Sequence, residues 1–166
     1  MIMRVIIMGV AGCGKTSVGE ALGKRLNLPY RDGDDLHPAA NVEKMRKGIP
    51  LTDEDRGPWL QQVGETLLRD APVIIGCSAL RRRYRDKIRE TAGGTVSFIH
   101  LSGSRAVIET RMAARQGHFM PVSLLDSQFA ALEVPSPDEG AFSVDIDQPL
   151  DAIVRAIETH LKGDAP

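Results

Sequence analysis

The stretch GVAGCGKT, from Gly9 to Thr16, carries the strongest structural signal in this chain. It matches the pattern G-x-x-x-x-G-K-[ST], directly follows the apolar run RVIIM (Arg4 to Met8) and opens a segment with helical spacing of apolar residues. A strand, this loop and a helix in that order are the context that a phosphate-binding loop requires. The context argues against the alternative, a glycine-rich turn that merely joins a strand to a helix. We therefore expect the loop to hold the phosphates of a nucleotide.

Each part of the loop has an expected task. The glycines let the backbone wrap around phosphate with its N–H groups pointing inward, and the N-terminus of the next helix adds the positive end of its dipole. We expect Lys15 to reach the β and γ phosphates and the Thr16 hydroxyl to ligate Mg²⁺. Cys13 is expected to be a small loop residue rather than a nucleophile. The residues expected to bind ATP here are Gly9, Val10, Ala11, Gly12, Cys13, Gly14, Lys15, Thr16 and Ser17.

Short apolar runs alternate with helical patterns along the chain. The runs are too uninterrupted for half-exposed strands and are typical of buried parallel strands. They cover Arg4 to Met8, Pro72 to Cys77, Ser97 to Leu101 and Phe142 to Ile146. Apolar residues at helical spacing follow, from Val18 to Leu26 and from Leu150 to Leu161. Because parallel strands need crossover connections, the pattern predicts a three-layer α/β/α P-loop NTPase fold with a parallel sheet, formed as a single domain over residues 1–166.

Bulk properties exclude several classes of partner. The formal net charge of −1 gives no basic field that would attract nucleic acid or an anionic membrane. The two cysteines, Cys13 and Cys77, lack metal-ligand spacing, which favours a reduced, cytoplasmic setting. The N-terminal apolar run is far too short for a membrane span and lacks a signal-peptide cleavage pattern. We expect a cytoplasmic protein that binds neither nucleic acid nor membrane.

Two polar stretches interrupt the alternation. Residues 32–69 open with the acidic turn DGDD and contain a short helix around Ala39 to Lys47, then a longer one from near Thr52. Thr52 and Asp55 resemble a capping box at the start of the longer helix. Residues 111–137 carry arginines and prolines between a helix and the last strand. Since such insertions over strand ends build substrate subdomains and lids, we expect an acceptor-binding stretch and a mobile lid.

Two missing motifs narrow the nucleotide-binding class. The sequence has no N/T-K-x-D motif, which a GTPase needs to recognise its base. The run from Pro72 to Cys77 also lacks the terminal aspartate through which many P-loop ATPases support Mg²⁺. Another carboxylate must then serve the metal, and Asp32 and Asp34 are the candidates.

Asp32, Asp34 and Asp35 follow a short predicted strand, Pro29 to Arg31, at the sheet edge where ligands bind. Alternate residues on extended chain point the same way, so Asp32 and Asp34 are expected to face the γ-phosphate together. We assign Asp32, with Thr16, to Mg²⁺ and Asp34 to the acceptor hydroxyl, which it orients and deprotonates. Which of the two touches the metal stays open. The alternative is an acidic turn that only caps the following helix.

Seven segments together resemble the gluconokinases of the small P-loop type, and they keep the family's order over nearly the whole chain. They are DGDDLHP (Asp32 to Pro38), NVEKM (Asn41 to Met45), GIPLTDEDRGPWL (Gly48 to Leu60), CSALRRRYRD (Cys77 to Asp86), RQGHFM (Arg115 to Met120), SQFAALEVP (Ser127 to Pro135) and DIDQPL (Asp145 to Leu150). The resemblance implies phosphorylation of D-gluconate at its terminal 6-hydroxyl by ATP with Mg²⁺, and a homodimer. The wider fold resembles shikimate kinases and nucleoside monophosphate kinases.

An acidic polyol needs a guanidinium for its carboxylate and several hydrogen-bonding groups for its hydroxyls. The resemblance to shikimate kinase-like proteins implies Arg56 for the carboxylate; the alternative is a solvated helix charge beside Glu54 and Asp55. His37 either hydrogen-bonds a hydroxyl or simply structures its turn before Pro38. Ser78 and Arg81 follow the third strand at the binding edge. Family members often have Lys where Arg81 stands, so the resemblance supports only its charge.

The lid and the adenine end complete the predicted site. Arg111 and Arg115 lie four residues apart on a predicted helix, so they share a face, and we expect them to stabilise charge on the transferred phosphoryl group. The alternative interpretation is that both are ordinary solvated arginines on a helix surface. We expect Gln148 and Pro149 to lie beside the adenine and to contact it mainly through their backbone atoms. Two other functions stay open: a kinase of another small hydroxy acid such as shikimate, and a nucleotide-binding module without transfer activity.

Overall fold

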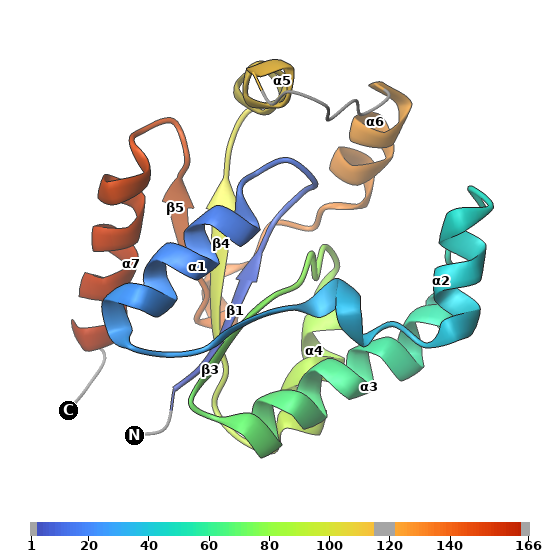
Figure 1. The fold of residues 1–166 in the computed structure, drawn as a ribbon, viewed down its shortest axis with the longest axis horizontal. Coiled ribbons are helices and arrows are strands. Elements are labelled where there is room, and N and C mark those ends of the chain that lie inside the picture. The colour runs from blue at the N-terminus through green and yellow to red at the C-terminus, as the bar shows by residue number, and fades with distance from the viewer. Residues whose placement is uncertain (1–2, 115–121, 164–166) are drawn as a thin grey trace.

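The computed structural model describes residues 3–114 and 122–163, and this part of the chain contains a parallel sheet with helices on both faces (Figure 1). The sheet has five strands in the order β2-β3-β1-β4-β5, and every neighbouring pair is parallel. The strands are β1 (Arg4–Met8), β2 (Tyr30–Asp32), β3 (Val73–Gly76), β4 (Ser97–Ser102) and β5 (Phe142–Asp145). The predicted parallel sheet is confirmed, including its short second strand.

Helices form the two outer layers. They are α1 (Lys15–Leu26), α2 (Ala39–Arg46), α3 (Asp53–Asp70), α4 (Arg82–Ala92), α5 (Arg105–Ala114), α6 (Val122–Ala131) and α7 (Leu150–Gly163). Figure 1 shows α1 and α7 against one face of the sheet and α3 and α4 against the other, while α5 and α6 lie beyond the upper strand ends and α2 stands at the right, beyond one end of α3. The three-layer fold is therefore confirmed. Within the described ranges, no helix combines the length and apolar character needed to cross a bilayer.

The core follows from the alternation of side chains along β1. Val5 and Ile7 pack in the cluster that faces α1 and α7, and Ile6 and Met8 pack in the cluster that faces α3 and α4. All four side chains are fully buried. A strand that is covered on both faces has no side chain directed at solvent. This is why the four residues after Arg4 are all apolar.

The sheet register brings the ends of the strands to one edge. Ile7 of β1 and Asp32 of β2 both pair with Gly76 of β3, and Met8 pairs with His100 of β4. The loops that follow β1, β2 and β3 therefore emerge side by side at the carboxyl edge of the sheet, where open α/β sheets bind their ligands.

The start of α3 agrees with the sequence. The Thr52 side chain accepts a hydrogen bond from the Asp55 N–H at 3.1 Å, and the Asp55 carboxylate accepts one from the Thr52 N–H at 2.9 Å. These two bonds satisfy backbone donors that would otherwise lack a partner in the first turn of the helix. The predicted capping box is confirmed.

The acidic turn after β2 differs from the expected extended chain. Gly33–Leu36 forms a short 3₁₀ helix, and Asp32 caps it by accepting a hydrogen bond from the Asp34 N–H at 2.9 Å through Oδ1. Asp side chains readily accept from the backbone N–H two residues on, and this local bond competes with extended geometry. The expected extended geometry from Asp32 to Asp34 is therefore wrong, and the placement of both carboxylates toward the γ-phosphate stays a prediction. Asp32 does cap the turn, as the alternative interpretation held.

Candidate active site

The phosphate-binding loop connects β1 to α1. Gly14 stands at the N-cap of α1 with a φ of 97°, a left-handed conformation that favours glycine. Lys15 Nζ donates to the carbonyl oxygens of Gly9 at 3.0 Å and of Val10 at 3.1 Å, so the ammonium group lies inside the loop. The backbone N–H groups at the start of α1 and this ammonium group together form a site for an anion such as phosphate.

Two features of the loop depend on its close packing. A Cβ at Gly12 would lie 2.7 Å from Sδ of Met112 on α5, so a larger residue there would displace the Met112 side chain, and the φ of 84° at Gly12 would strain it further. Cys13 is buried, and burial raises the pKa of its thiol against the opposing charge of Lys15. Because a raised pKa keeps the thiol protonated, Cys13 acts as a small buried loop residue and not as a nucleophile.

Asp34 is brought into the electrostatic range of Lys15 by the 3₁₀ turn. Partial burial raises the pKa of the Asp34 carboxyl group, the charges of Asp32 and Asp35 raise it further, and the ammonium group of Lys15 opposes them. The side chain is nevertheless open to solvent at the mouth of the site. A carboxylate beside the phosphate loop with a raised pKa has the properties of a general base for a hydroxyl group.

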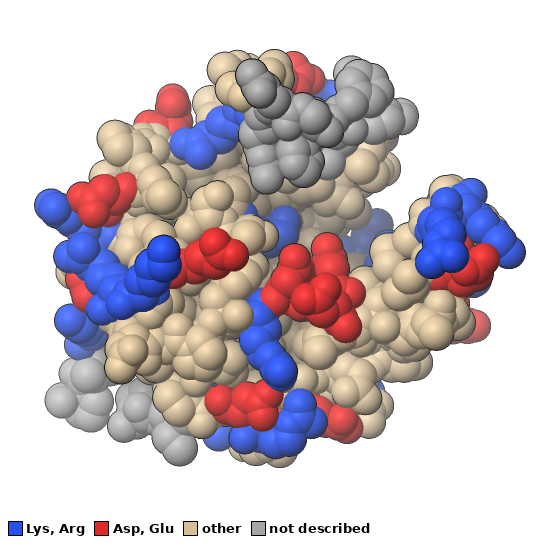
Figure 2. Space-filling model, viewed as in Figure 1, with Lys and Arg blue, Asp and Glu red and all other residues tan. Residues whose placement is uncertain are grey.

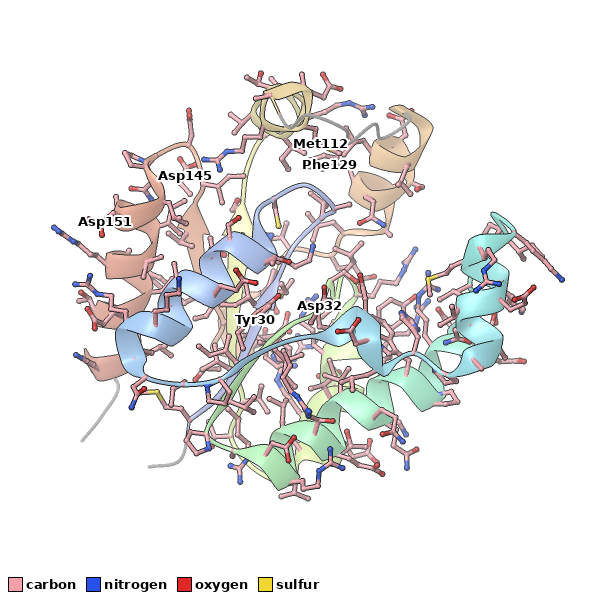
Figure 3. All side chains as sticks on the ribbon, viewed as in Figure 1. Tyr30, Asp32, Met112, Phe129, Asp145 and Asp151 are labelled. Atoms are coloured by element: carbon pink, nitrogen blue, oxygen red, sulfur yellow. The ribbon has the colours of Figure 1, made fainter. Side chains whose placement is uncertain are left out.

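Tyr30 is a site residue that the sequence interpretation missed. Burial raises the pKa of Tyr30 to about 12 and keeps its hydroxyl protonated, and the nearby Thr16 hydroxyl opposes that shift. A Cβ at Gly19 of α1 would overlap the Tyr30 ring, and one at Gly76 of β3 would overlap its hydroxyl. Figure 3 shows Tyr30 beside Asp32 at the strand ends. The signal in the sequence was a glycine within a helix and another at a strand end, which often mark close packing.

His37 stands at the end of the acidic turn and stacks on Trp59 of α3, with ring centroids 4.1 Å apart. Its Nδ1 lies 3.2 Å from Nδ2 of Asn41, which can only donate, so Nδ1 is the accepting nitrogen. Burial lowers the pKa of His37, and the charge of Arg56 lowers it further. The neutral ring thus structures the turn and keeps Nε2–H as a donor. Both interpretations of His37 are compatible with this geometry.

Trp59, which the sequence interpretation did not single out, holds the acidic turn against α3. Its indole Nε1–H donates to the Gly33 carbonyl oxygen at 2.8 Å, and the side chain is buried. Its position inside the apolar face of a long helix gives no sign of this contact, which joins residues 26 apart in sequence.

Arg56 is more than a solvated helix charge. Its Nη1 donates to the Leu51 carbonyl oxygen at 2.9 Å and lies 3.7 Å from Oδ1 of Asp53. The guanidinium group also lies over the Tyr84 ring, 5.3 Å from its centroid. The side chain is therefore held in one place beside His37, while a guanidinium group has further N–H donors that suit a carboxylate.

Ser78 and Arg81 lie in the loop after β3, next to the phosphate loop. The Ser78 carbonyl oxygen accepts a hydrogen bond from the Gly9 N–H at 3.3 Å, which joins the two loops directly. Arg81 stands at the N-cap of α4, and its Nη1 lies 3.7 Å from Oε2 of Glu133. Ala79, between them, has a φ of 43°, an uncommon left-handed conformation for a residue other than glycine.

Arg111 lies at the adenine end of the predicted site. Its Nη2 donates to the carbonyl oxygen of Ile146 and lies 3.4 Å from that of Gln148. The structure thus brings Arg111 together with Gln148, and Pro149 follows at the start of α7, where its carbonyl oxygen accepts from Ile153 N. Arg115 lies outside the described residues, as do Gly117 and His118 of the expected lid. A role for Arg111 and Arg115 on the phosphates stays a prediction.

The acidic side chains of the turn gather at the centre of the face shown in Figure 2. The surface is hollowed between this acidic patch and α2, and blue basic side chains are visible in the hollow. Opposite charges thus meet at the carboxyl edge of the sheet, where a metal–phosphate complex and an anionic acceptor would both find partners.

The donor set suits Mg²⁺ with a nucleotide better than a metal held by protein alone. No group of three or more His, Cys, Asp or Glu side chains among residues 3–114 and 122–163 is arranged to hold a metal ion. Mg²⁺ commonly takes one or two protein oxygens and completes its octahedron with phosphates and water. The Thr16 hydroxyl and one carboxylate of the acidic turn fit that need.

Comparisons with known proteins agree with this geometry. The family model of shikimate kinase matches residues 11–122. The thermoresistant gluconokinase of Escherichia coli (strain K12) is 44% identical over 164 residues, which cover 95% of this chain and 93% of the relative. The gluconokinase of Gluconobacter oxydans (strain 621H) is 40% identical over 96% of this chain and 92% of its own length.

Solved structures point the same way. A gluconokinase from Sinorhizobium meliloti 1021 superposes with a TM-score of 0.87 at 46% identity, covering 99% of this chain and 98% of its own. A shikimate kinase from Bacteroides thetaiotaomicron, at 12% identity, has a TM-score of 0.67 over 98% of this chain and 99% of its own and shows the shared fold alone. The chain therefore belongs to the gluconokinases, within the shikimate kinase-like family of P-loop kinases.

Proposed function

We propose that this protein transfers the γ-phosphoryl group of ATP to the 6-hydroxyl of D-gluconate, giving 6-phospho-D-gluconate and ADP. The observation that carries the proposal is Asp34, a carboxylate with a raised pKa beside Lys15 of the phosphate loop. Membership of the gluconokinases supports gluconate as the acceptor. The same geometry supports ATP as the donor, because the loop and the start of α1 form a phosphate site.

The transfer follows from the placement of the groups. Lys15 and the backbone N–H groups at the start of α1 hold the β and γ phosphates. Thr16 and Asp32 would hold Mg²⁺, which when bound neutralises charge on the phosphates. Asp34 orients the 6-hydroxyl and accepts its proton as the oxygen attacks phosphorus and the bond to the ADP oxygen breaks. Arg111 and Arg115 stabilise the charge on the transferred group.

The acceptor is oriented by cations and hydrogen-bonding groups around the acidic turn. We propose that Arg56 binds the gluconate carboxylate. We also propose that Arg81, in the loop after β3, adds a second positive charge near the acceptor. His37 donates from Nε2 to a hydroxyl, and Ser78 provides a further polar contact. The stretch 32–69 acts as the acceptor-binding part and residues 111–137 as the lid of a single domain over residues 1–166, with residues 128–133 as the fixed base of that lid on the core. We further propose that the protein is cytoplasmic and that it forms a homodimer. Sedimentation analysis tests the oligomeric state directly.

A coupled assay of ADP release tests the proposal. It compares gluconate, other aldonates, shikimate and AMP as acceptors at saturating ATP and Mg²⁺. We expect release that depends on gluconate and is lost without Mg²⁺. Faster release with shikimate would assign the site to another hydroxy acid. Tight ATP binding with no transfer to any acid would leave only a nucleotide-binding module.

A further inference from the structure

One residue of α6 contacts the phosphate loop directly. Oε1 of Gln128 accepts a hydrogen bond from the Ala11 N–H at 3.0 Å, and the Gln128 side chain is half-buried. The two residues are 117 positions apart, so the contact is made by the tertiary fold and not by the loop itself. The phosphate site proper is formed by the N–H groups at the start of α1, after Gly14. The Ala11 N–H lies earlier in the loop and is directed at α6, so the bond to Gln128 shapes the loop from outside.

A second contact lies just after α6. The Glu133 N–H donates to the Leu80 carbonyl oxygen at 2.7 Å, and Oε1 of Glu133 accepts from the Arg82 N–H at 2.8 Å. Arg82 is the first residue of α4, so this carboxylate satisfies a backbone donor at a helix N-terminus. The buried Arg85 donates from Nη2 to the Glu133 carbonyl oxygen at 3.0 Å. Glu133 thus fixes the loop of residues 78–82, which we call the acceptor loop.

The chain between these two contacts is short and packed. The Leu132 N–H donates to the Gln128 carbonyl oxygen at 3.0 Å, which continues the helical pattern past Ala131. Phe129 and Leu132 pack against the core cluster that also contains Val10 of the phosphate loop. In Figure 3, Phe129 lies near Met112, between α6 and α5. A helical turn anchored in a core moves as a unit, because packed interiors deform little.

We propose that residues 128–133 form a bridge that sets the position of the phosphate loop relative to the acceptor loop, with Gln128 and Glu133 as positioning residues at its two ends. The inference rests on the proposed function, since it assumes that the phosphate loop holds the donor and the acceptor loop contacts gluconate. In-line transfer needs the hydroxyl oxygen close to the γ-phosphorus, and small errors in that approach slow the reaction strongly. Loss of either end of the bridge therefore reduces the rate of transfer more than the binding of either substrate.

Steady-state kinetics of Q128A and E133A test the bridge. Because each variant loses a neutral or charge-assisted hydrogen bond, we expect kcat to fall by about three- to tenfold in each, with KM for ATP changed by less than about threefold. E133Q keeps an oxygen that accepts from the Arg82 N–H and should recover most of kcat. Q61A is the matched control, because Gln61 is exposed on α3 and bonds Glu65 of the same helix. If Q128A unfolds, Q128M provides similar bulk without the accepting oxygen.

The double variant Q128A/E133A separates a bridge from two independent contacts. If both ends serve one connection, the second loss adds little, and kcat of the double variant lies within about twofold of the slower single variant. Two losses that multiply would overturn the proposal, as would a Q128A enzyme with the kcat of Q61A. Failure of the proposed function is a different result, because the unmodified protein would then show no gluconate-dependent ADP release.

Discussion

Asp34 combines two opposing environments. Partial burial and the neighbouring Asp32 raise the pKa of its carboxyl group, and Lys15 lowers it. Its ionised form is thus disfavoured relative to an isolated Asp but stays close to Lys15, the cation that we propose to contact the γ-phosphate. This balance makes the carboxylate a better proton acceptor at the moment when the acceptor hydroxyl loses its proton.

The first prediction concerns D34N, which keeps the shape of the side chain but cannot accept the proton. We expect kcat to fall by about 10²- to 10⁴-fold, the usual range for general base catalysis. The thermal midpoint should not fall, because the substitution removes a charge whose folded-state pKa is raised and which therefore gives no stability at neutral pH. A D34N protein with unchanged kcat would remove Asp34 from the chemistry.

The same residue predicts the acid limb of the pH profile. In the proposed mechanism activity needs the Asp34 carboxylate, and since the pKa of Asp34 is raised, protonation begins at a higher pH than for an ordinary Asp. The rate of the unmodified enzyme at saturating substrates should therefore fall on the acid side at a pH above the usual Asp range. A profile of kcat against pH checks this, and a limb at or below the ordinary pKa of Asp would contradict the assignment.

Tyr30 supports the third prediction at this scale. Y30F keeps the ring that fills the space beside Gly19 and Gly76 but removes the hydroxyl group that lies near Thr16. We propose Thr16 as a ligand of Mg²⁺, and neighbouring groups orient such ligands, so we expect the Mg²⁺ concentration for half-maximal activity to rise by about two- to tenfold with kcat largely kept. Titration of Mg²⁺ into the enzyme with ADP, followed by calorimetry, gives a second readout. An unchanged Mg²⁺ dependence in both measurements would contradict the role.

At the scale of elements, the start of α3 links helix stability to the acceptor site. The capping box fixes Thr52 and Asp55, and Asn41 of α2 donates to the Asp55 carbonyl oxygen at 2.9 Å. Arg56 lies in the same first turn. T52A should therefore lower the free energy of unfolding by about 1 kcal/mol, as expected for loss of an N-cap, and raise KM for gluconate. Urea unfolding measures the first effect, with T110A as a control on an exposed helix position.

A buried ion pair joins α4 to the chain before β5. Arg85 and Glu139 have side chains only 0% and 1% exposed, and Nε of Arg85 lies 2.7 Å from Oε1 of Glu139. Removal of one partner leaves an uncompensated buried charge, so E139Q should cost about 3 kcal/mol in the free energy of unfolding. The exposed neighbour Asp138, paired with Arg82, is the matched control, and D138N should cost much less than E139Q because solvent screens the exposed pair. Equal stability of the two variants would contradict the distinction.

At the scale of the whole molecule, several carboxylates tie acid stability to ion pairs. The pKa values of Asp55, Asp138 and Glu139 are each lowered to about 2, chiefly by hydrogen bonds from Lys44, Arg82 and Arg85. A group with a lowered pKa adds stability that is present above its unfolded value and is lost as pH falls toward the folded value. The free energy of unfolding should therefore decline between about pH 4 and pH 2. In E139Q, the free energy of unfolding should decline less steeply over this pH range. Urea unfolding at several pH values measures the difference.

The sequence predicts the parts of this molecule that depend on local patterns. Apolar runs locate the strands that are buried on both faces, and the spacing in GVAGCGKT locates the loop between β1 and α1. The capping box at Thr52 is equally local. In each case, the residues that make the structure lie next to one another in the chain.

Contacts between distant segments could not be predicted in this way. Trp59 reaches the acidic turn and Gln128 reaches Ala11 only because the sheet order places their elements side by side. The geometry of the acidic turn was missed for a different reason. The hydrogen bond from the Asp34 N–H to Asp32 replaces extended chain with a 3₁₀ turn, and a pattern of alternating acidic residues does not distinguish the two.

Phosphorus NMR of the reaction product tests the central claim most directly. After incubation of the unmodified protein with ATP, Mg²⁺ and D-gluconate, the account predicts a phosphomonoester signal split by the two protons of a primary carbon, together with an equal amount of ADP. That result places the phosphate on the 6-hydroxyl. ADP release without this signal, or a signal coupled to a single proton of a secondary carbon, would contradict transfer to the terminal hydroxyl of gluconate.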